Sequence, residues 1–130
     1  MAASPPTILV VDDSDTIRSL IVLNLQLDGF TVVEAHDGQE CLDVVKAVAP
    51  DLITLDVAMP RRDGFSTVEA LRADPETGHI PIVMVSARAQ GSDLARGQEV
   101  GVDAYLTKPF EPEQLVATVR SLVADGDQMP

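Results

Sequence analysis

Apolar runs alternate with segments of helical periodicity along the chain, and this alternation predicts its secondary structure. A short continuous run of apolar residues bounded by polar ones is typical of a strand that is buried on both faces. The runs predict five strands, at Thr7–Val11, Phe30–Ala35, Asp51–Asp56, Ile80–Ser86 and Ala104–Thr107.

The segments between these runs repeat apolar residues every three or four positions, as one face of a helix requires. In the first segment Ile17, Leu20, Ile21 and Leu25 follow this spacing, and Gly29 marks its end. The spacing predicts five helices, at Ser14–Asp28, Gly38–Ala49, Phe65–Ala73, Gln90–Val100 and Glu111–Ala124.

Strands that alternate with helices in this way predict an α/β fold, in which helices cover both faces of a parallel sheet. The 130 residues show no internal repeat and no linker, so we expect a single domain over residues 1–130. Its core is expected at about residues 7–124, with loose termini at 1–6 and 125–130. Gly64, in the loop before the third helix, predicts a turn with positive φ.

The charge of the chain narrows the partners that it can bind. The formal net charge is −12, and the only lysines are Lys46 and Lys108. Such an acidic chain repels nucleic-acid phosphates and anionic lipids, so we expect no direct binding to nucleic acid or membranes. The start of the chain lacks the basic and apolar stretches of a secretion signal, and no apolar run approaches the roughly 20 residues of a membrane span. We therefore expect a cytoplasmic location.

Chemically active residues stand at the ends of four predicted strands. Asp12 and Asp13 follow the first strand and Asp56 ends the third, whereas Ser86 ends the fourth and Lys108 follows the fifth. Ligands of an open parallel sheet bind beyond the carboxyl ends of its strands. We therefore expect these five residues to converge at one edge of the sheet.

Three neighbouring carboxylates repel one another, and a hard divalent cation relieves that repulsion. An oxygen-only ligand set without histidine or cysteine points to Mg²⁺, with Mn²⁺ as the alternative. Ser86 and Lys108 add a hydroxyl and an ammonium, which together suit a phosphoryl group. Two structural alternatives stay open for these residues: Asp12 or Asp13 could be a helix N-cap, and Lys108 a solvated surface lysine. The sequence also leaves open whether the peptide before Pro109 is cis.

Five motifs in order resemble the response-regulator receiver family of bacterial two-component signalling, over roughly Thr7 to Ala124. Each motif is weak alone, but their order and spacing together are specific. The motifs are Ile8-Leu9-Val10-Val11-Asp12-Asp13, Asp51-Leu52-Ile53-Thr54-Leu55-Asp56-Val57-Ala58-Met59-Pro60, Asp63-Gly64-Phe65, Pro81-Ile82-Val83-Met84-Val85-Ser86-Ala87 and Tyr105-Leu106-Thr107-Lys108-Pro109-Phe110.

The resemblance implies a doubly wound, flavodoxin-like sheet with strand order 2-1-3-4-5, and a role for each residue of the site. Asp56 would accept a phosphoryl group from a sensor histidine kinase or a histidine phosphotransfer protein. The only reactions expected are self-phosphorylation and self-dephosphorylation, so the chain would be a switch and not an enzyme.

The resemblance also implies how the site is built. Mg²⁺ would be held by Asp13, Asp56 and the backbone carbonyl of Ala58, and by Asp12 through water. Lys108 would pair with the phosphoryl oxygens and Ser86 would hydrogen-bond one of them. Tyr105 would rotate with the state of the site and change a surface made by the fourth helix, the fifth strand and the fifth helix.

Other readings stay open at this stage. Asp13-Ser14-Asp15 faintly resembles the paired aspartates of the haloacid-dehalogenase class, which would make the chain a small aspartyl-phosphate phosphatase. The chain could also be a degenerate receiver that binds proteins without phosphorylation, although Asp12, Asp13, Asp56 and Lys108 are all present. The sequence does not decide between a stand-alone regulator and a receiver cut from a longer protein. The downstream target and a phosphorylation-linked dimer are left open too.

Overall fold

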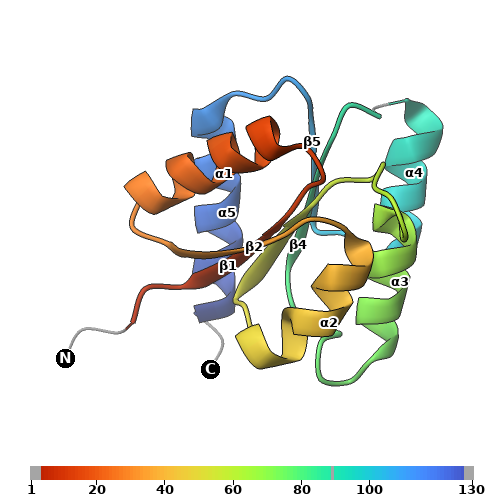
Figure 1. Cartoon of the computed structure of the whole chain (residues 1–130), viewed down its shortest axis with the longest axis horizontal. Coiled ribbons are helices and arrows are strands. Elements are labelled where there is room, and N and C mark those ends of the chain that lie inside the picture. The colour runs from red at the N-terminus through yellow and green to blue at the C-terminus, as the bar shows by residue number, and fades with distance from the viewer. Residues whose placement is uncertain (1–3, 89, 128–130) are drawn as a thin grey trace.

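A computed structural model describes residues 4–88 and 90–127, and its five strands form one parallel sheet (Figure 1). The order β2-β1-β3-β4-β5 confirms the prediction. The strands are β1 (Thr7–Val11), β2 (Thr31–Ala35), β3 (Leu52–Leu55), β4 (Ile82–Ser86) and β5 (Ala104–Thr107).

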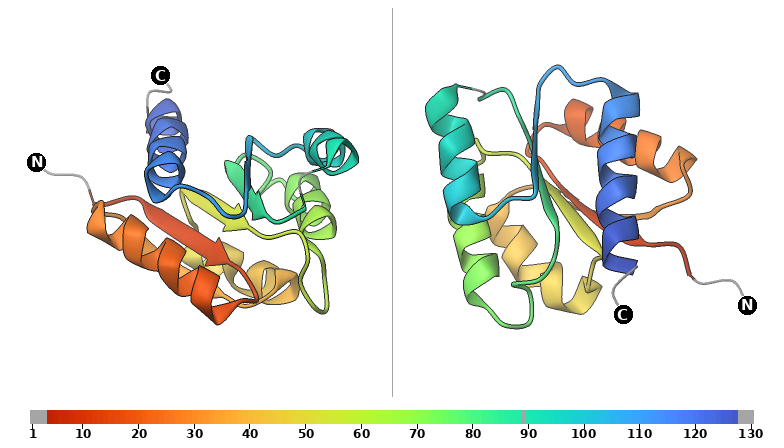
Figure 2. Two further views of the ribbon diagram at one scale, coloured as in Figure 1. Left: turned by 90° about the horizontal axis from the view of Figure 1, so that it is seen from above. Right: turned by 180° about the vertical axis from the view of Figure 1, so that it is seen from behind.

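Five helices connect and cover these strands (Figures 1 and 2). The helices are α1 (Asp15–Leu27), α2 (Gly38–Val48), α3 (Gly64–Ala73), α4 (Gly91–Val100) and α5 (Pro112–Asp127). Helices α1 and α5 lie on one face of the sheet, and α2, α3 and α4 lie on the other. No helix of the described residues is long and apolar enough to cross a membrane.

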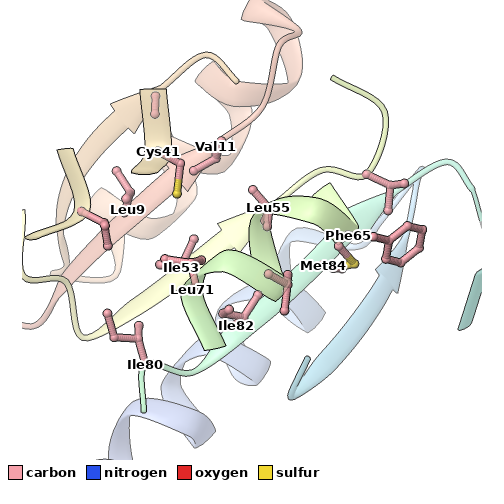
Figure 3. Packing of buried hydrophobic residues seen from close by; sticks show 14 residues of the cluster. Leu9, Val11, Cys41, Ile53, Leu55, Phe65, Leu71, Ile80, Ile82 and Met84 are labelled. Atoms are coloured by element: carbon pink, nitrogen blue, oxygen red, sulfur yellow. The ribbon is translucent and has the colours of Figure 1, made fainter. Parts of the chain in front are cut away.

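Each face of the sheet carries its own apolar core, which explains why the strands read as continuous apolar runs. On the α2–α4 face, side chains of β1, β3 and β4 pack against helix residues such as Cys41, Phe65 and Leu71 (Figure 3). On the opposite face, β-strand residues pack against Ile21 and Leu25 of α1 and against α5. Consecutive residues of the central strands β1, β3 and β4 are therefore buried, whereas the edge strands β2 and β5 are partly exposed.

The element boundaries differ from the predictions at two instructive places. The last helix continues to Asp127, beyond the predicted end at Ala124. The prediction ended the helix at its last apolar positions, but the helical backbone continues past them. The predicted loose termini, 1–6 and 125–130, stay a prediction, and residues 1–3 and 128–130 lie outside the described part. In addition, Ser14 is the N-cap of α1, where its side chain accepts a hydrogen bond from the Ile17 N–H. The alternative that Asp12 or Asp13 caps this helix is wrong.

Gly64 is required for a reason other than the predicted one. Among the described glycines, positive φ occurs at Gly29 and Gly101, so the predicted positive φ at Gly64 is wrong. Gly64 is the first residue of α3, and a Cβ there would lie 2.2 Å from the carbonyl oxygen of Asp56 and 2.9 Å from the Met84 Cε. The absence of a side chain lets α3 start directly against the backbone of Asp56.

Candidate functional site

The register of β1 and β3 places Asp12 and Asp56 next to each other at one edge of the sheet. Val11 and Leu55 are paired at the ends of the two strands, and each aspartate follows directly. The backbone N–H of Asp56 donates to the Val11 carbonyl at 3.1 Å. The strand order changes direction between β1 and β3, and this is where an open parallel sheet binds its ligands.

Asp12, Asp13 and Asp56 form one acidic cluster, as predicted from the strand ends. A carboxylate oxygen from each of them lies within 4.8 Å of the other two. Asp12 and Asp56 are buried, at 1% and 6% exposed, whereas Asp13 is exposed. Three oxygen ligands, one of them open to solvent, fit a hard cation such as Mg²⁺ that keeps part of its water shell.

Lys108 completes the cluster from the end of β5. Its Nζ donates to Asp12 Oδ2 at 2.9 Å and to Asp56 Oδ2 at 3.3 Å. Only 15% of the side chain is exposed, so the alternative of a solvated surface lysine is wrong. The Lys108 N–H donates to the Ser86 carbonyl at 2.9 Å, and the following peptide bond, Lys108–Pro109, is cis.

The second oxygen of each buried carboxylate is held by the backbone. Asp12 Oδ1 accepts the Ser14 N–H at 2.9 Å, and Asp56 Oδ1 accepts the Val57 N–H at 2.7 Å. Both carboxylates are therefore fixed between a backbone donor and the Lys108 ammonium. This geometry holds two acidic groups in place before any ligand arrives.

Burial and charge oppose each other in this cluster. Burial raises the pKa of Asp12 and the charge of Asp56 raises it further, against the lowering effect of Lys108 and the Ser14 N–H. Burial alone would lower the pKa of Lys108, but its hydrogen bond and charge interaction with Asp12, together with the charge of Asp56, raise it above the usual value. Lys108 is therefore a firmly protonated cation that faces carboxylates at close range.

Ser86 and Tyr105 meet at a third residue, Arg88. Ser86 is 1% exposed, and its Oγ accepts the Arg88 backbone N–H at 3.1 Å. The Tyr105 hydroxyl donates to the Arg88 carbonyl. The Tyr105 ring lies against Gly97 of α4, where a Cβ would come within 3.2 Å of the ring. The two residues predicted to switch together are thus linked through one stretch of backbone.

The remaining predicted ligand, Ala58, lies in the loop after β3 and is exposed. A bidentate ion pair joins this loop to the start of α2: Arg61 Nε lies 2.9 Å from Asp37 Oδ2, and Arg61 Nη2 lies 3.1 Å from Asp37 Oδ1. Arg61 has a φ of 66°, which is rare for a residue with a side chain. No feature of the sequence indicated this contact, because an arginine in a polar loop resembles any solvated residue.

A buried arginine, Arg18, was also missed by the sequence analysis. Its guanidinium donates to the carbonyl of Asp12 at 2.9 Å, and only 8% of the side chain is exposed. Arg18 lies three residues before Ile21 and seven before Leu25, both buried, and this helical spacing is a signal that could have pointed to its burial.

Comparison with known proteins agrees with this geometry. The family model of the response regulator receiver domain matches residues 8–120. The chain is 40% identical over 125 residues to the DNA-binding dual master transcriptional regulator RpaA of Synechocystis sp.. This match covers 96% of this chain and 52% of RpaA. The chain is also 41% identical over 116 residues to the transcriptional regulatory protein CpxR of Escherichia coli K12. That match covers 89% of this chain and 48% of CpxR.

A solved structure gives the same picture. The crystal structure of a putative response regulator from Chloroflexus aurantiacus J-10-fl matches with a TM-score of 0.88 and 38% identity, covering 92% of this chain and 98% of that one. The chain spans about half the length of the curated relatives that it matches. From its fold, its strand-end residues and these matches, the chain belongs to the response regulator receiver domain family and is a phospho-accepting module of phosphorelay signalling.

Proposed function

We propose that Asp56 accepts a phosphoryl group in a Mg²⁺-dependent reaction and that this switches the surface formed by α4, β5 and α5. The observation that carries the proposal is the position of the Lys108 ammonium, which bridges Asp12 and Asp56 at 2.9 and 3.3 Å beside the exposed Asp13. A cation, an acceptor carboxylate and a metal-binding pair are groups that phosphoryl transfer to a carboxylate uses.

Asp13, Asp56 and the carbonyl of Ala58 would hold Mg²⁺ directly, and Asp12 would hold it through water. The donor set fits, because it consists of oxygen atoms only and includes one exposed carboxylate. When bound, Mg²⁺ supplies positive charge that offsets the negative charge of the phosphoryl oxygens. Manganese, with the same preference for oxygen, is the alternative occupant.

The chemical step forms a bond between a carboxylate oxygen of Asp56 and phosphorus. The bond from phosphorus to the imidazole nitrogen of the donor breaks, and its electron pair leaves with the imidazole. The Val57 N–H holds one carboxylate oxygen of Asp56, which orients the nucleophile. Lys108 stabilises the charge on the phosphoryl oxygens, a role for which its raised pKa keeps it protonated.

The switch uses the link between Ser86 and Tyr105. Ser86 Oγ accepts the Arg88 N–H, so its own proton is available for a phosphoryl oxygen. A shift of Ser86 toward that oxygen pulls on the backbone of Arg88, whose carbonyl accepts the Tyr105 hydroxyl. Because the Tyr105 ring packs against Gly97, the shift reaches the surface of α4 and β5.

The proposed partners follow from the chemistry of the site and the charge of the chain. The donor is a sensor histidine kinase or a histidine phosphotransfer protein, and the downstream partner is a protein. We propose that this chain itself makes no direct contact with nucleic acid, because its net charge is −12. One matched relative is named a DNA-binding regulator, but this chain spans only about half of it.

We also propose that the chain is a single receiver domain and that it is active in the cytoplasm.

The test is phosphorylation by acetyl phosphate in the presence of Mg²⁺, followed by intact-mass measurement. We expect one added phosphoryl group on the wild type and none on Asp56→Asn, whereas the matched surface variant Asp51→Asn labels like the wild type. Labelling of Asp56→Asn, or no labelling of the wild type, contradicts the proposal. Continued phosphate release from a small phosphoester, well beyond one equivalent, would instead indicate a phosphatase.

The switch has its own readout. The chain has one tyrosine and no tryptophan, so its intrinsic fluorescence reports on Tyr105 alone. We expect phosphorylation to change this fluorescence in the wild type and not in Ser86→Ala, which lacks the hydroxyl. An equal change in Ser86→Ala contradicts the proposed coupling while leaving phosphoryl transfer to Asp56 intact.

A further inference from the structure

Arg18 is a charged residue buried beside the acidic cluster without facing any of its carboxylates. It lies in the first turns of α1, and 8% of its side chain is exposed. Its three donor groups each have one partner. Nη1 donates to the Asp12 carbonyl at 2.9 Å, Nε to Glu34 Oε1 at 2.9 Å and Nη2 to Asp15 Oδ1 at 2.5 Å.

These partners come from three different parts of the fold. Glu34 is on β2, where it pairs in register with Val10 of β1, and Asp15 starts α1. Burial alone would lower the pKa of Arg18. The hydrogen bonds and charges of Asp15 and Glu34 outweigh this effect, so the pKa of Arg18 is raised above its usual value. Because Glu34 and Asp15 balance the charge, Arg18 acts on the acidic cluster through its hydrogen bond to the Asp12 carbonyl.

That hydrogen bond fixes a peptide plane. The carbonyl of Asp12 belongs to the rigid, planar peptide between Asp12 and Asp13, so holding the oxygen also sets the orientation of the Asp13 N–H and limits its φ. The Asp12 side chain has further contacts, with the Ser14 N–H and Lys108. Asp13 is exposed, so packing does not fix its carboxylate and its direction depends on the backbone.

We propose that Arg18 is a positioning residue for the cation site: it holds the peptide between Asp12 and Asp13 so that both carboxylates face the same ion. This inference rests on the proposed function, because it assigns a role in Mg²⁺ binding to a residue that touches no bound ion. Residues that orient metal ligands from behind commonly change metal affinity by about 10- to 100-fold when they are replaced.

The chain offers a matched control in Arg72. This arginine is also largely buried, with 22% of its side chain exposed, and it also holds backbone carbonyls and a carboxylate. It donates to Gly101 O at 3.0 Å, Gly78 O at 3.1 Å, Ile80 O at 2.6 Å and Asp103 Oδ2 at 3.1 Å. These partners precede β4 and β5, at the edge of the sheet opposite to the acidic cluster. Loss of Arg72 therefore affects stability but not the cation site.

The experiment is calorimetric titration of Mg²⁺, and separately of Mn²⁺, into the unphosphorylated full chain. We expect Arg18→Met to bind Mg²⁺ about tenfold more weakly than the wild type. Arg18→Lys keeps one donor and should recover part of that loss. Arg72→Met should bind Mg²⁺ as the wild type does, even though its melting temperature falls.

Three outcomes overturn the inference. The first is wild-type affinity in a folded Arg18→Met, and the second is an equal loss of affinity in Arg72→Met, which would make the effect one of general stability. If Arg18→Met does not fold, Arg18→Lys is the deciding variant. The third outcome is that Arg18→Lys binds Mg²⁺ with wild-type affinity although its melting temperature is reduced. These failures differ from failure of the proposed function, in which the wild type itself neither binds Mg²⁺ nor accepts phosphate on Asp56.

Discussion

Lys108 and Asp12 are 96 positions apart in the chain, yet the Lys108 ammonium donates to the Asp12 carboxylate at 2.9 Å, closer than the 3.3 Å to Asp56. The lysine therefore contacts both the proposed acceptor and a proposed metal-binding residue. In this arrangement one cation offsets the repulsion between two buried carboxylates. Its removal should affect stability and function in separable ways.

Lys108→Ala should destabilise the Mg²⁺-free chain by about 3 kcal/mol, because it leaves two buried carboxylates without their cation. Added Mg²⁺ should restore stability, so the melting temperature of the variant should rise more with Mg²⁺ than that of the wild type. Phosphoryl acceptance and the Tyr105 response should be lost. Lys46→Ala removes the only other lysine, which is exposed, and should behave like the wild type. Thermal melts with and without Mg²⁺ measure this, and no Mg²⁺-dependent difference between the variants would contradict it.

Thr54→Val should stabilise the chain by about 1 kcal/mol. Thr54 is 1% exposed, and its hydroxyl has no hydrogen-bond partner among the residues that the structure describes. Valine has the same shape without the unsatisfied polar group. The control is Thr67→Val, since Thr67 is fully buried and its hydroxyl donates to the Asp63 carbonyl at 2.7 Å. Urea denaturation should show opposite signs for the two variants, and a shared sign would refute the assignment.

Gly64→Ala should destabilise the chain by about 2 kcal/mol and slow its labelling by acetyl phosphate. The added Cβ would lie 2.2 Å from the Asp56 carbonyl, so the backbone of the proposed acceptor has to move. Gly91 is likewise the first residue of a helix, but a Cβ there meets nothing within 4 Å. Gly91→Ala should therefore keep wild-type stability and labelling. Wild-type behaviour of Gly64→Ala in both measurements would show that the contact is tolerated.

Arg61→Gln should lower stability in a pH-dependent way. The hydrogen bonds from Arg61 lower the pKa of Asp37, with help from the Glu40 N–H. A carboxyl group whose pKa is lower in the folded state stabilises that state above its unfolded pKa of about 3.9, and this contribution is lost as the pH falls through the folded value. The difference between the wild type and Arg61→Gln should therefore be full near neutral pH and shrink as the pH falls below about 4. Urea denaturation over this range measures it, and a difference independent of pH would argue against the ion pair.

Much of the fold was predictable because its signals are local. A strand buried on both faces reads as a continuous apolar run, and this placed the central strand β1 at its observed bounds. The short run at Ala104–Thr107 likewise placed the edge strand β5. Parallel strands bring their carboxyl ends to one edge of the sheet, so Asp12, Asp13 and Asp56 could be grouped from sequence positions alone. The strand order came from the resemblance and not from the pattern of residues, and the structure confirms it.

The sequence by itself thus determined which residues stand at the strand ends and which segments fill the core. Only the tertiary structure decided how those residues pair: Lys108 with Asp12 as well as Asp56, Ser86 with the backbone of Arg88, and Arg18 with the carbonyl of Asp12. It also decided that Gly64 is needed for close packing and not for its φ. The physical reason is that periodicity reports which face of an element is apolar, whereas the partner of a buried charge is set by strand register and by elements distant in the chain.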